Sequence, residues 1–425
     1  MKHENIQRVT LDNGVRLLML PSDHGRSASV SLWIGSGSRF EIPEHSGASH
    51  YIEHMLFKGT ARRSARELAE ESDAIGGQLN AYTTKEYTCV YTRALDSHLA
   101  RAIDLITDMT TCCRMGESDF EVERGVILEE IGMYEDSPED LMIDGLYSTL
   151  WKGSMLGANI LGTRDSIAQM TTDKLRAHMA EQYTGSRIVC AVSGSFDPDA
   201  VTAQITAALG DLPRGDVPMI AQPAQYHRGT RLIEKDFEQT HIGLCFPGLA
   251  YNDPRRHALG ILNSICGGSS SSRLFQRIRE ELGLAYSVGC SSAPYMAEGM
   301  FEVDAAVSPK NEEAAISELV KQLCLLRRDG VTQQEFDRAK EQLKASVVMG
   351  LEGNSAIAAH MGRGELLHGR IRSEDDILAG IDAVTVDQVN EAARIFIDFD
   401  NYSFCAAGKI RNAEVYDGVV RGSVF

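Results

Sequence analysis

The segment His50-Tyr51-Ile52-Glu53-His54 places two imidazoles four residues apart, with a carboxylate beside the second. On an α-helix, four steps of the 3.6-residue turn return to within about 40°, so both imidazoles lie on one face. Neutral imidazoles in this arrangement can bind one Zn²⁺, and Glu53 is placed to deprotonate a water at the metal. Three polar residues can also come together by chance, so the zinc hypothesis depends on finding a further ligand.

A catalytic zinc that is held by two imidazoles needs a third protein ligand and one open position. Downstream, Ser118-Asp-Phe-Glu121 is a capping box that predicts a helix from Glu121 to Tyr134, ending before a proline. Glu123 and Glu130 are seven residues apart on this helix, so they share a face to within about 20°.

Glu130 is therefore a candidate ligand, and Glu123 is a candidate acceptor for the N–H of a ligand imidazole. Glu129 points about 100° away, toward the side that a solvated acid would take. The alternative is a solvated acidic face on an amphipathic helix, and spacing alone does not decide between the two interpretations.

The elements that must position these residues can be predicted from residue patterns. Pro43 and Gly47 precede a short buried helix that contains the two histidines, and Gly59 is a natural stop for it. Ser64-Ala-Arg-Glu67 is a second capping box, for a helix that ends at Gly76-Gly77. The remaining expected elements are a hairpin at 8–20, strands at 28–34, 78–82, 87–93 and 187–192, and helices at 99–109, 139–150, from 172 and at 198–209.

The second half of the chain echoes the first with a spacing of about 214 residues. Thr171-Thr-Asp173 and its helix correspond to Thr385-Val-Asp387 and its helix, 385 − 171 = 214 residues later. The second half has no His-x-x-Glu-His, and Ser346 falls near the place that corresponds to Glu130. We therefore expect only the first half to carry a metal site.

Strands that alternate with helices in both halves predict an α+β fold. We expect two tandem homologous α/β sandwich domains, each with helices packed on a mixed or antiparallel sheet, in a clam-shell assembly that could enclose a cavity. The segment 213–229 has three prolines and little periodicity, which is typical of a linker. The expected domains are therefore 1–212, with the metal site, and 230–425, without one.

Composition restricts the function further. The chain has 425 residues and a net charge of −18, which argues against nucleic acid and anionic membrane surfaces as partners. We find no apolar leader and no run long enough to span a membrane. The nine cysteines are scattered and odd in number, so we expect reduced thiols in a cytoplasmic protein and do not expect them to bind the zinc.

Four motifs, in order along nearly the whole chain, resemble the pitrilysin family of zinc peptidases (inverzincins), in the branch of mitochondrial processing peptidase and its bacterial relatives. The segment from His50 to Thr60 resembles the inverted zinc motif. The other three segments are similar to the edge strand, the downstream glutamate motif and the Arg/Tyr substrate element of the family: Ile75-Gly-Gly-Gln-Leu-Asn80-Ala-Tyr-Thr83, Glu123-Arg-Gly-Val-Ile-Leu-Glu-Glu130 and Ser272-Arg-Leu-Phe-Gln-Arg-Ile-Arg279-Glu-Glu-Leu-Gly-Leu-Ala-Tyr286-Ser-Val.

This resemblance implies a zinc-dependent endopeptidase that hydrolyses extended or unfolded peptides in a closed chamber. It places Zn²⁺ on His50, His54 and Glu130, with Glu53 as the proton carrier and Glu123 in support. It also implies that an exposed strand at 78–82 binds the peptide and that Asn80 contacts the peptide backbone. The alternative is that Asn80 is only a turn residue. Arg279 and Tyr286 would stabilise the negative charge that develops on the carbonyl oxygen.

The chain has two of the four repeats from which such chambers are built, so the resemblance implies a homodimer. Two alternatives stay open: a proteolytically silent core-type assembly subunit, and a peptide-binding module with a structural zinc. A structural zinc is usually closed by a fourth protein ligand, and none is evident. Ser154-Met155 and Ala158-Asn159 depart from the His-Pro and Arg-Pro pairs of many bacterial relatives, which leaves the shape of this loop open.

Overall fold

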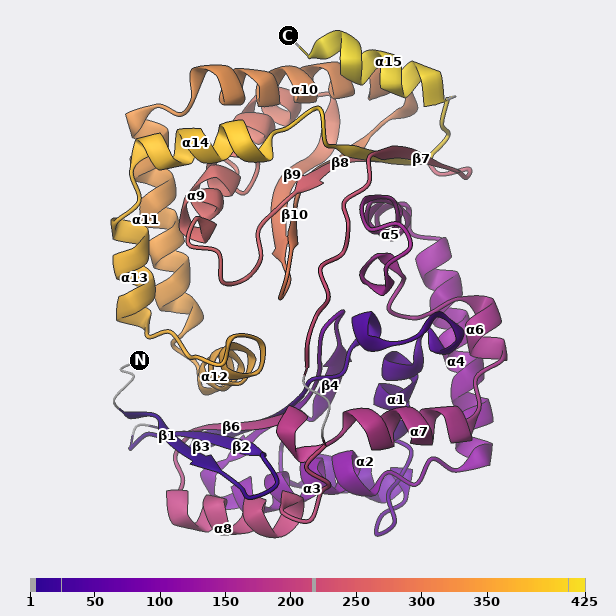
Figure 1. The fold of residues 1–425 in the computed structure, drawn as a ribbon, viewed down its shortest axis with the longest axis vertical. Helices are drawn as coiled ribbons and strands as arrows, with labels where there is room; N and C mark the ends of the chain where they lie inside the picture. Colours follow the sequence, from indigo (N-terminus) through magenta and orange to yellow (C-terminus); the bar gives the residue numbers. More distant parts are fainter. Residues whose placement is uncertain (1–4, 24, 216–218, 412, 425) are drawn as a thin grey trace. The chain divides into compact units, whose positions relative to one another are not determined.

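The chain folds into two compact units, each with its own sheet (Figure 1). The structure is a computed structural model that describes residues 5–23, 25–215, 219–411 and 413–424. Unit 1 comprises residues 1–131, 159–221 and 348–376. Unit 2 comprises residues 132–158, 222–347 and 377–425.

Unit 1 is built on a six-stranded sheet with the strand order β1-β2-β6-β3-β5-β4. Strands β2 and β6 are parallel, and the other neighbours are antiparallel. Strand β4 lies at one end of this order, so one of its edges has no neighbouring strand among the described residues. The strands are β1 (Gln7–Thr10), β2 (Arg16–Pro21), β3 (Ser27–Ile34), β4 (Asn80–Thr83), β5 (Thr88–Leu95) and β6 (Ile188–Gly194).

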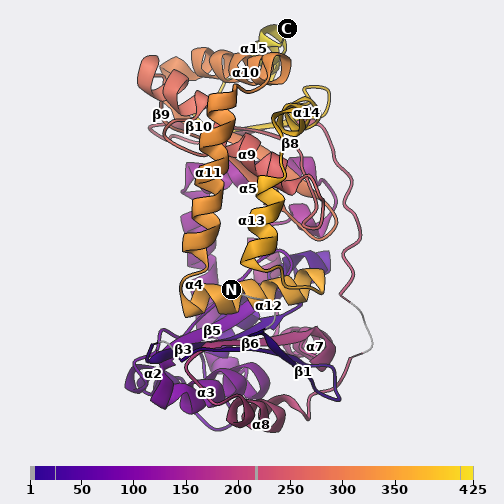
Figure 2. The same ribbon diagram turned by 90° about the vertical axis from the view of Figure 1, so that its left-hand side faces the viewer.

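Helices cover both faces of this sheet. Figure 2 shows α12 across one face, with α3 and α8 on the other. The helices of unit 1 are α1 (Ala48–Leu56), α2 (Ala65–Ala74), α3 (Leu99–Cys112), α4 (Glu117–Glu135, to residue 131), α6 (Arg164–Ala168), α7 (Thr172–Gln182), α8 (Pro198–Leu209) and α12 (Asn354–His368). The apolar core lies between the sheet and α1, α3, α4 and α8.

Unit 2 has a five-stranded sheet with the order β7-β11-β8-β10-β9, in which only β7 and β11 are parallel. Its strands are β7 (Gly229–Glu234), β8 (Thr240–Pro247), β9 (Ala285–Pro294), β10 (Gly299–Val307) and β11 (Ser403–Gly408). Its helices are α5 (Pro138–Leu150), α9 (Arg256–Cys266), α10 (Glu312–Asp329), α11 (Gln333–Gly350), α13 (Glu374–Asp382), α14 (Val386–Phe396) and α15 (Ala413–Ser423), with a π-helical segment, η7 (Phe275–Glu281).

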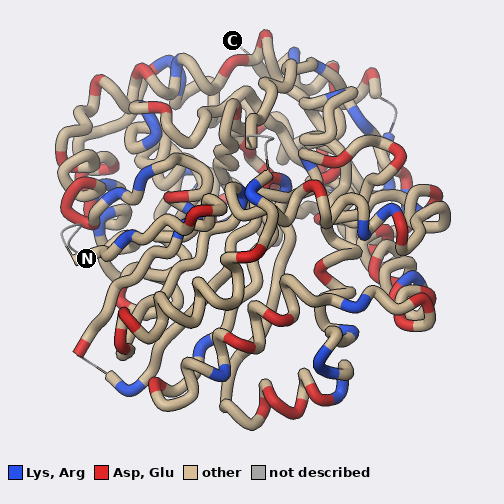
Figure 3. The backbone as a smooth tube through the Cα atoms, turned by 60° about the horizontal axis from the view of Figure 1, so that its bottom comes forward, with Lys and Arg blue, Asp and Glu red and all other residues tan. Residues whose placement is uncertain are grey.

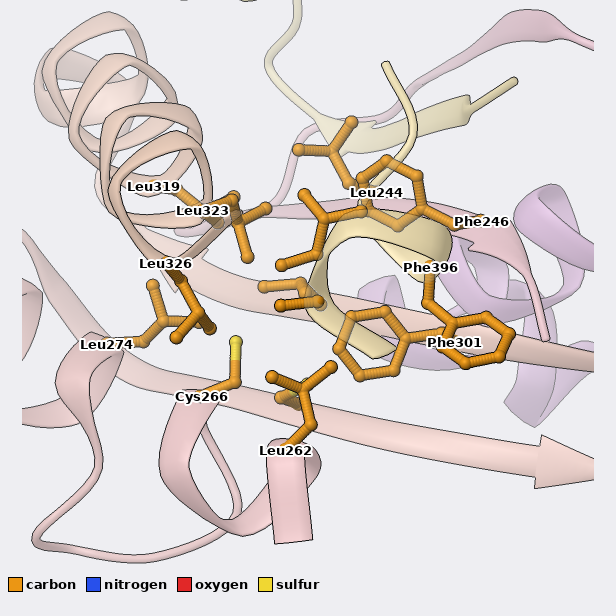
Figure 4. Close-up of a cluster of buried hydrophobic side chains, with 14 of the residues drawn as sticks. Leu244, Phe246, Leu262, Cys266, Leu274, Phe301, Leu319, Leu323, Leu326 and Phe396 are labelled. Carbon is orange, nitrogen blue, oxygen red and sulfur yellow. The ribbon is translucent and has the colours of Figure 1, made fainter. Parts of the chain in front are cut away.

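The core of unit 2 packs side chains of α9, α10 and α14 against one face of the sheet. Figure 4 shows Leu262, Leu323 and Phe396 from these helices around Leu244 and Phe301 from the strands. Helix α5 packs on β7, β8 and β11 and contributes to a second, smaller apolar cluster.

The sheet topologies confirm the internal duplication that the sequence predicts. The run β2-β6-β3-β5-β4 has the same order and strand directions as β7-β11-β8-β10-β9. Each compact unit also contains one helix from the other half of the chain, since α5 belongs to unit 2 and α12 to unit 1. The predicted α+β class is therefore confirmed. The boundaries 1–212, 213–229 and 230–425 divide the chain by sequence, whereas each compact unit contains segments from both halves.

Most predicted elements appear near their expected positions, with one correction. The helix that we expected to open at the capping box Ser118-Asp-Phe-Glu121 begins at Glu117, so Ser118 lies inside α4 and is not its cap. The amide of Phe120 already donates to Gly116 O at 2.9 Å, which closes the first helical turn before the predicted start. The capping box at Ser64 is confirmed, with both of its hydrogen bonds formed.

The surface charge and the thiols agree with an ordinary acidic globular chain. In Figure 3, acidic and basic residues are interspersed along the backbone. All nine cysteines are free thiols, and most are buried. Among the described residues, no helix is both long enough and apolar enough to cross a membrane.

Candidate metal centre

Helix α1 carries the two histidines, and its start is fixed by a buried acid. Gly47 precedes the helix with a φ of 93°, in the left-handed region that favours glycine. The carboxylate of Glu41 accepts hydrogen bonds from the backbone N–H groups of Gly47 at 2.8 Å and Ser49 at 2.7 Å. These are among the N–H groups that a helix start leaves unpaired. Burial raises the pKa of Glu41 to about 7, against these hydrogen bonds.

Helix α4 is held against α1 by an aromatic contact. The rings of Tyr51 and Phe120 stack with centroids 4.6 Å apart, and the Tyr51 hydroxyl donates to Phe120 O at 2.6 Å. Both side chains are fully buried. This contact fixes the relative position of the two helices, so residues two to three turns along α4 reach the histidines.

His50, His54 and Glu130 converge on one point. Glu130 Oε2 lies 3.5 Å from His50 Nε2 and 3.5 Å from His54 Nε2, and one ligand atom from each residue lies within 4.8 Å of the others. In a tetrahedral zinc site with bonds of about 2.0–2.1 Å, neighbouring ligand atoms are about 3.3 Å apart. The donor set, the spacing and the number of ligands therefore fit zinc.

The second ring nitrogen of His54 has its own partner. Its Nδ1 lies 3.0 Å from Glu123 Oε2, and Glu123 Oε1 lies 2.6 Å from Lys58 Nζ. Glu123 is only 3% exposed, so this buried carboxylate is compensated by both neighbours. The contact favours the tautomer in which Nδ1–H donates to Glu123 and leaves Nε2 free to bind a metal. Glu123 lies where the sequence predicted it.

The pKa values of the two imidazoles are shifted in opposite directions. Burial, with His54 nearby, lowers the pKa of His50 to about 4, so this ring is neutral at physiological pH. Burial also lowers the pKa of His54, but its contacts with Glu130 and Glu123 outweigh this and raise it. The hydrogen bond with His54 lowers the pKa of Glu130, which is therefore an anion.

Glu53 lies beside this group and is anchored to the edge strand. Burial raises the pKa of Glu53, and hydrogen bonds with Thr83 of β4 oppose the shift. Its Oε2 is buried and has no hydrogen-bond partner among the described residues. A buried carboxylate with one free oxygen next to the ligands is suited to accept and return a proton.

Asn80 and Glu129 are both exposed. Asn80 opens the edge strand β4, and its side-chain Oδ1 accepts from the backbone N–H of Ala81 at 2.9 Å. Its predicted contact with a peptide remains a prediction. The exposure of Glu129 agrees with the solvated side that the helical spacing indicated.

Arg279 and Tyr286 lie together in unit 2, although not on one helix. Arg279 belongs to η7, which ends at Glu281, and Gly283 follows with a φ of 58°. Tyr286 is 73% exposed at the start of β9. The Arg279 guanidinium carbon is 6.0 Å from the Tyr286 ring centroid and 4.7 Å from that of Phe275. A cation and a phenol are therefore available on the same surface of this unit.

Three residues that support the site were not predicted from the sequence. Glu41 caps α1, Lys58 neutralises Glu123, and Thr83 holds Glu53. Lys58 lies two residues beyond the end of α1, so the helical spacing did not indicate its contact with Glu123. Glu41 and Thr83 act through tertiary contacts, which no local spacing indicates.

Two family models match this chain. The insulinase family (peptidase family M16) matches residues 17–164, and the peptidase M16 inactive domain matches residues 169–343. The first match contains all three candidate ligands, and the second begins after them and contains none of them. This division agrees with the expectation that one repeat alone carries the metal.

Similar proteins are described as zinc proteases. A Bacillus subtilis (strain 168) protein, described as the uncharacterized zinc protease YmxG, is 39% identical over 391 residues, covering 92% of this chain and 95% of that protein. A Streptomyces coelicolor protein, also described as an uncharacterized zinc protease, is 40% identical over 398 residues, covering 92% and 86%. A protease from Helicobacter pylori has a similar structure, with a TM-score of 0.89 at 21% identity, covering 95% of this chain and 99% of that one.

Proposed function

Because the chain belongs to the insulinase family of zinc peptidases, peptidase family M16, we propose that it is an endopeptidase that cleaves extended or unfolded peptides in a chamber formed by two copies of the chain. The observation that supports this proposal most is the convergence of His50 Nε2, His54 Nε2 and a Glu130 oxygen at zinc-ligand spacing. All three ligands and the carboxyl group of Glu53 are present in one unit.

In the proposed reaction, His50, His54 and Glu130 hold the zinc. When bound, zinc supplies a Lewis acid that acidifies water and polarises a carbonyl. Glu53 takes the proton from the attacking water and later passes a proton to the leaving amine. Glu123 and Lys58 keep the His54 ring oriented throughout, through the hydrogen bond to Nδ1 and the ion pair behind it.

Peptide binding is assigned to the free edge of β4. An extended peptide that pairs with this edge is held through its backbone, so recognition tolerates many sequences. Hydrogen bonds with Thr83 place Glu53 next to this strand. Arg279 and Tyr286 are proposed to stabilise the negative charge on the carbonyl oxygen, in this chain or in a second copy.

The test is hydrolysis of internally quenched peptides by the purified protein. We expect turnover that o-phenanthroline abolishes and stoichiometric zinc restores, with cleavage at internal bonds. A protein that binds zinc through these ligands and cleaves no peptide would instead support the silent assembly subunit. Retention of zinc against the chelator, without turnover, would support a structural zinc in a peptide-binding module.

A further inference from the structure

An apolar cavity of about 280 Å³ lies in unit 1 between the sheet and α12. Trp33, Tyr82 and Tyr91 form its aromatic walls, and Ala356 and Ala359 of α12 supply small side chains opposite them. Figure 2 shows α12 lying over this face of the sheet. Tyr82 is 37% exposed, so this part of the cavity wall reaches the solvent at the edge strand β4.

The strand register explains why the aromatic residues meet. In the antiparallel pairs, Cys89 of β5 lies opposite both Tyr82 of β4 and Trp33 of β3. Directly opposed residues project to the same face of a sheet. The Tyr82 ring centroid is 6.3 Å from that of Trp33 and 6.0 Å from that of Tyr91, with edge-to-face geometry in both pairs. The three rings therefore form a preorganised wall.

Two of the polar groups at the cavity already have hydrogen-bond partners. The Trp33 indole N–H donates to Ser31 Oγ at 2.9 Å, and the Ser29 hydroxyl donates to Thr92 O at 3.2 Å. Among the described residues that line the cavity, none is Asp, Glu, Lys or Arg. A charged group placed there would lose water and gain no partner, which is costly, whereas an apolar group would gain by burial.

The cavity and Glu53 lie on opposite faces of the edge strand β4. Side chains alternate along β4, so Tyr82 faces α12 while its neighbour Thr83 faces α1, where its hydroxyl lies 3.5 Å from Ser49 O. Thr83 is also the hydrogen-bond partner of Glu53. A peptide that pairs with the free edge of β4 has the same alternation. A residue that turns toward the cavity is therefore flanked by residues on the Glu53 side.

We propose that this cavity is a specificity subsite that receives one large apolar side chain, preferably aromatic, of a peptide paired with β4 close to the bond that is cleaved. The inference rests on the proposed peptidase function and names its substrate class. The volume accommodates a phenylalanine-sized group, and the edge-to-face rings provide matching aromatic contacts. Backbone pairing with β4 then binds the peptide, and the cavity determines which side chain is preferred at one position.

The first test compares quenched peptides that differ only by Phe, Leu, Ala or Lys at each of three positions on either side of the cleaved bond. At one position we expect kcat/KM to be at least about tenfold higher for Phe than for Ala, with Lys the poorest. Ala359→Phe or Ala356→Leu fills the cavity and should bring the Phe/Ala ratio at that position close to one. The matched control is Ala69→Phe on the exposed surface of α2, which should keep the wild-type ratio.

Zinc content and the thermal unfolding midpoint verify that each variant is folded. The proposal is overturned if no position prefers an apolar residue, or if folded, zinc-loaded cavity variants keep the wild-type ratio. Ala356→Leu is the milder substitution, so it carries the test if Ala359→Phe does not fold.

The second test measures binding without turnover, so that it separates this proposal from the peptidase proposal. Trp33 and Trp151 are the only two tryptophans, so a Glu53→Gln, Trp151→Phe protein reports on Trp33 alone. A peptide that contains 4-nitrophenylalanine should quench Trp33 fluorescence, and an alanine peptide should not compete as well as a phenylalanine peptide. If wild type cleaves nothing but this quenching occurs, the endopeptidase proposal fails and the subsite stands. Absence of quenching, or equal quenching by free nitrophenylalanine amide, overturns the subsite.

Discussion

Glu123 illustrates how much of the candidate site depends on a residue that binds no metal. It accepts from His54 Nδ1 at 3.0 Å and pairs with Lys58 at 2.6 Å, while 97% of its surface is covered. Removing it would leave Lys58 without its partner and the His54 ring free to rotate. The carboxylate therefore positions a ligand, and its loss should weaken zinc binding before it affects the proton transfer.

We predict that Glu123→Ala lowers the zinc affinity about 10- to 100-fold, the range found when the partner of a ligand histidine is removed. Competition with a chromogenic chelator measures this affinity directly. Glu123→Gln keeps an acceptor for His54 and should lose less, while Glu129→Ala on the exposed side of α4 is the matched control. Wild-type zinc affinity in Glu123→Ala would contradict the positioning role.

Local spacing predicted the candidate ligands better than their supports. His50 and His54 share a face because of the helical repeat, and Glu130 was one of two acids on the correct face of its helix. The choice of Glu130 over a solvated acid came from the family resemblance and not from spacing. Glu41 and Thr83 were not predicted, since their roles depend on segments that meet only in the folded chain.

Among the elements, the residues that lead into η7 are anchored to α11 by an ion pair. Arg273 Nε and Nη2 donate to the two carboxylate oxygens of Glu335 at 2.6 and 2.8 Å. Burial raises the pKa of Glu335, but hydrogen bonds from Arg273 and Thr332 outweigh it and lower the pKa to about 2. The folded-state pKa is below the unfolded value, so this pair stabilises the protein above about pH 4.5 and loses that effect as the pH falls toward 2.

We predict that Glu335→Gln destabilises the protein at pH 7, by at most about 3 kcal/mol. The difference in unfolding free energy between wild type and variant should shrink as the pH falls from 7 to 3. Denaturant unfolding of the two proteins across this range measures it. A difference that is constant with pH would mean that the charge on Glu335 has no stabilising role.

Glu302 on β10 should show the opposite pH dependence. It is 7% exposed, and burial, with Asp304 and Glu139 nearby, raises its pKa to about 7. The charged form is therefore disfavoured in the folded state, and stability is lost as the pH rises from about 4.5 through 7. We predict that Glu302→Gln raises the thermal unfolding midpoint relative to wild type at pH 8 and much less at pH 5. Calorimetry of both proteins measures these midpoints. An equal gain in the midpoint at pH 8 and pH 5 would contradict the prediction.

The order of the elements was largely predictable, because capping residues and hydrophobic periodicity are local. Helix α8 starts and ends where the pattern at 198–209 indicated. The start of α4 was not predicted, because the helix begins at Glu117, about one turn before the expected start at Glu121. The placement of α5 and α12 in the unit of the opposite half was also missed, since an amphipathic helix does not specify which sheet it covers.

In the proposed homodimer, one metal site in each chain is sufficient for an active chamber. The chain carries both the zinc ligands and the Arg279/Tyr286 pair, so two copies can complete a chamber without a different partner. We propose that the zinc centre of one copy works with Arg279 and Tyr286 of the other. The acidic net charge of −18 would favour basic peptides as they approach.

Mixing two variants with impaired turnover tests this cross-chain arrangement. Glu53→Gln lacks the proton carrier and Tyr286→Phe lacks the phenol, so each homodimer should be slow. After subunit exchange, each heterodimer has one active site in which Glu53 of one chain and Tyr286 of the other are both intact. We expect the mixture to reach about one quarter of wild-type turnover, since half the dimers are mixed and each has one intact position. Turnover of the mixture equal to the mean of the two variants would rule out cross-chain action.

The central claim is that His50, His54 and Glu130 hold a zinc whose chemistry depends on Glu53. The most direct measurement is zinc content, by mass spectrometry of the native protein, together with peptide turnover, for wild type, Glu53→Gln and Glu130→Gln. We predict one zinc per chain in wild type and in Glu53→Gln, with turnover at least about 10²-fold lower in Glu53→Gln, and loss of both zinc and turnover in Glu130→Gln. Full zinc in Glu130→Gln, or undiminished turnover in Glu53→Gln, would contradict the account.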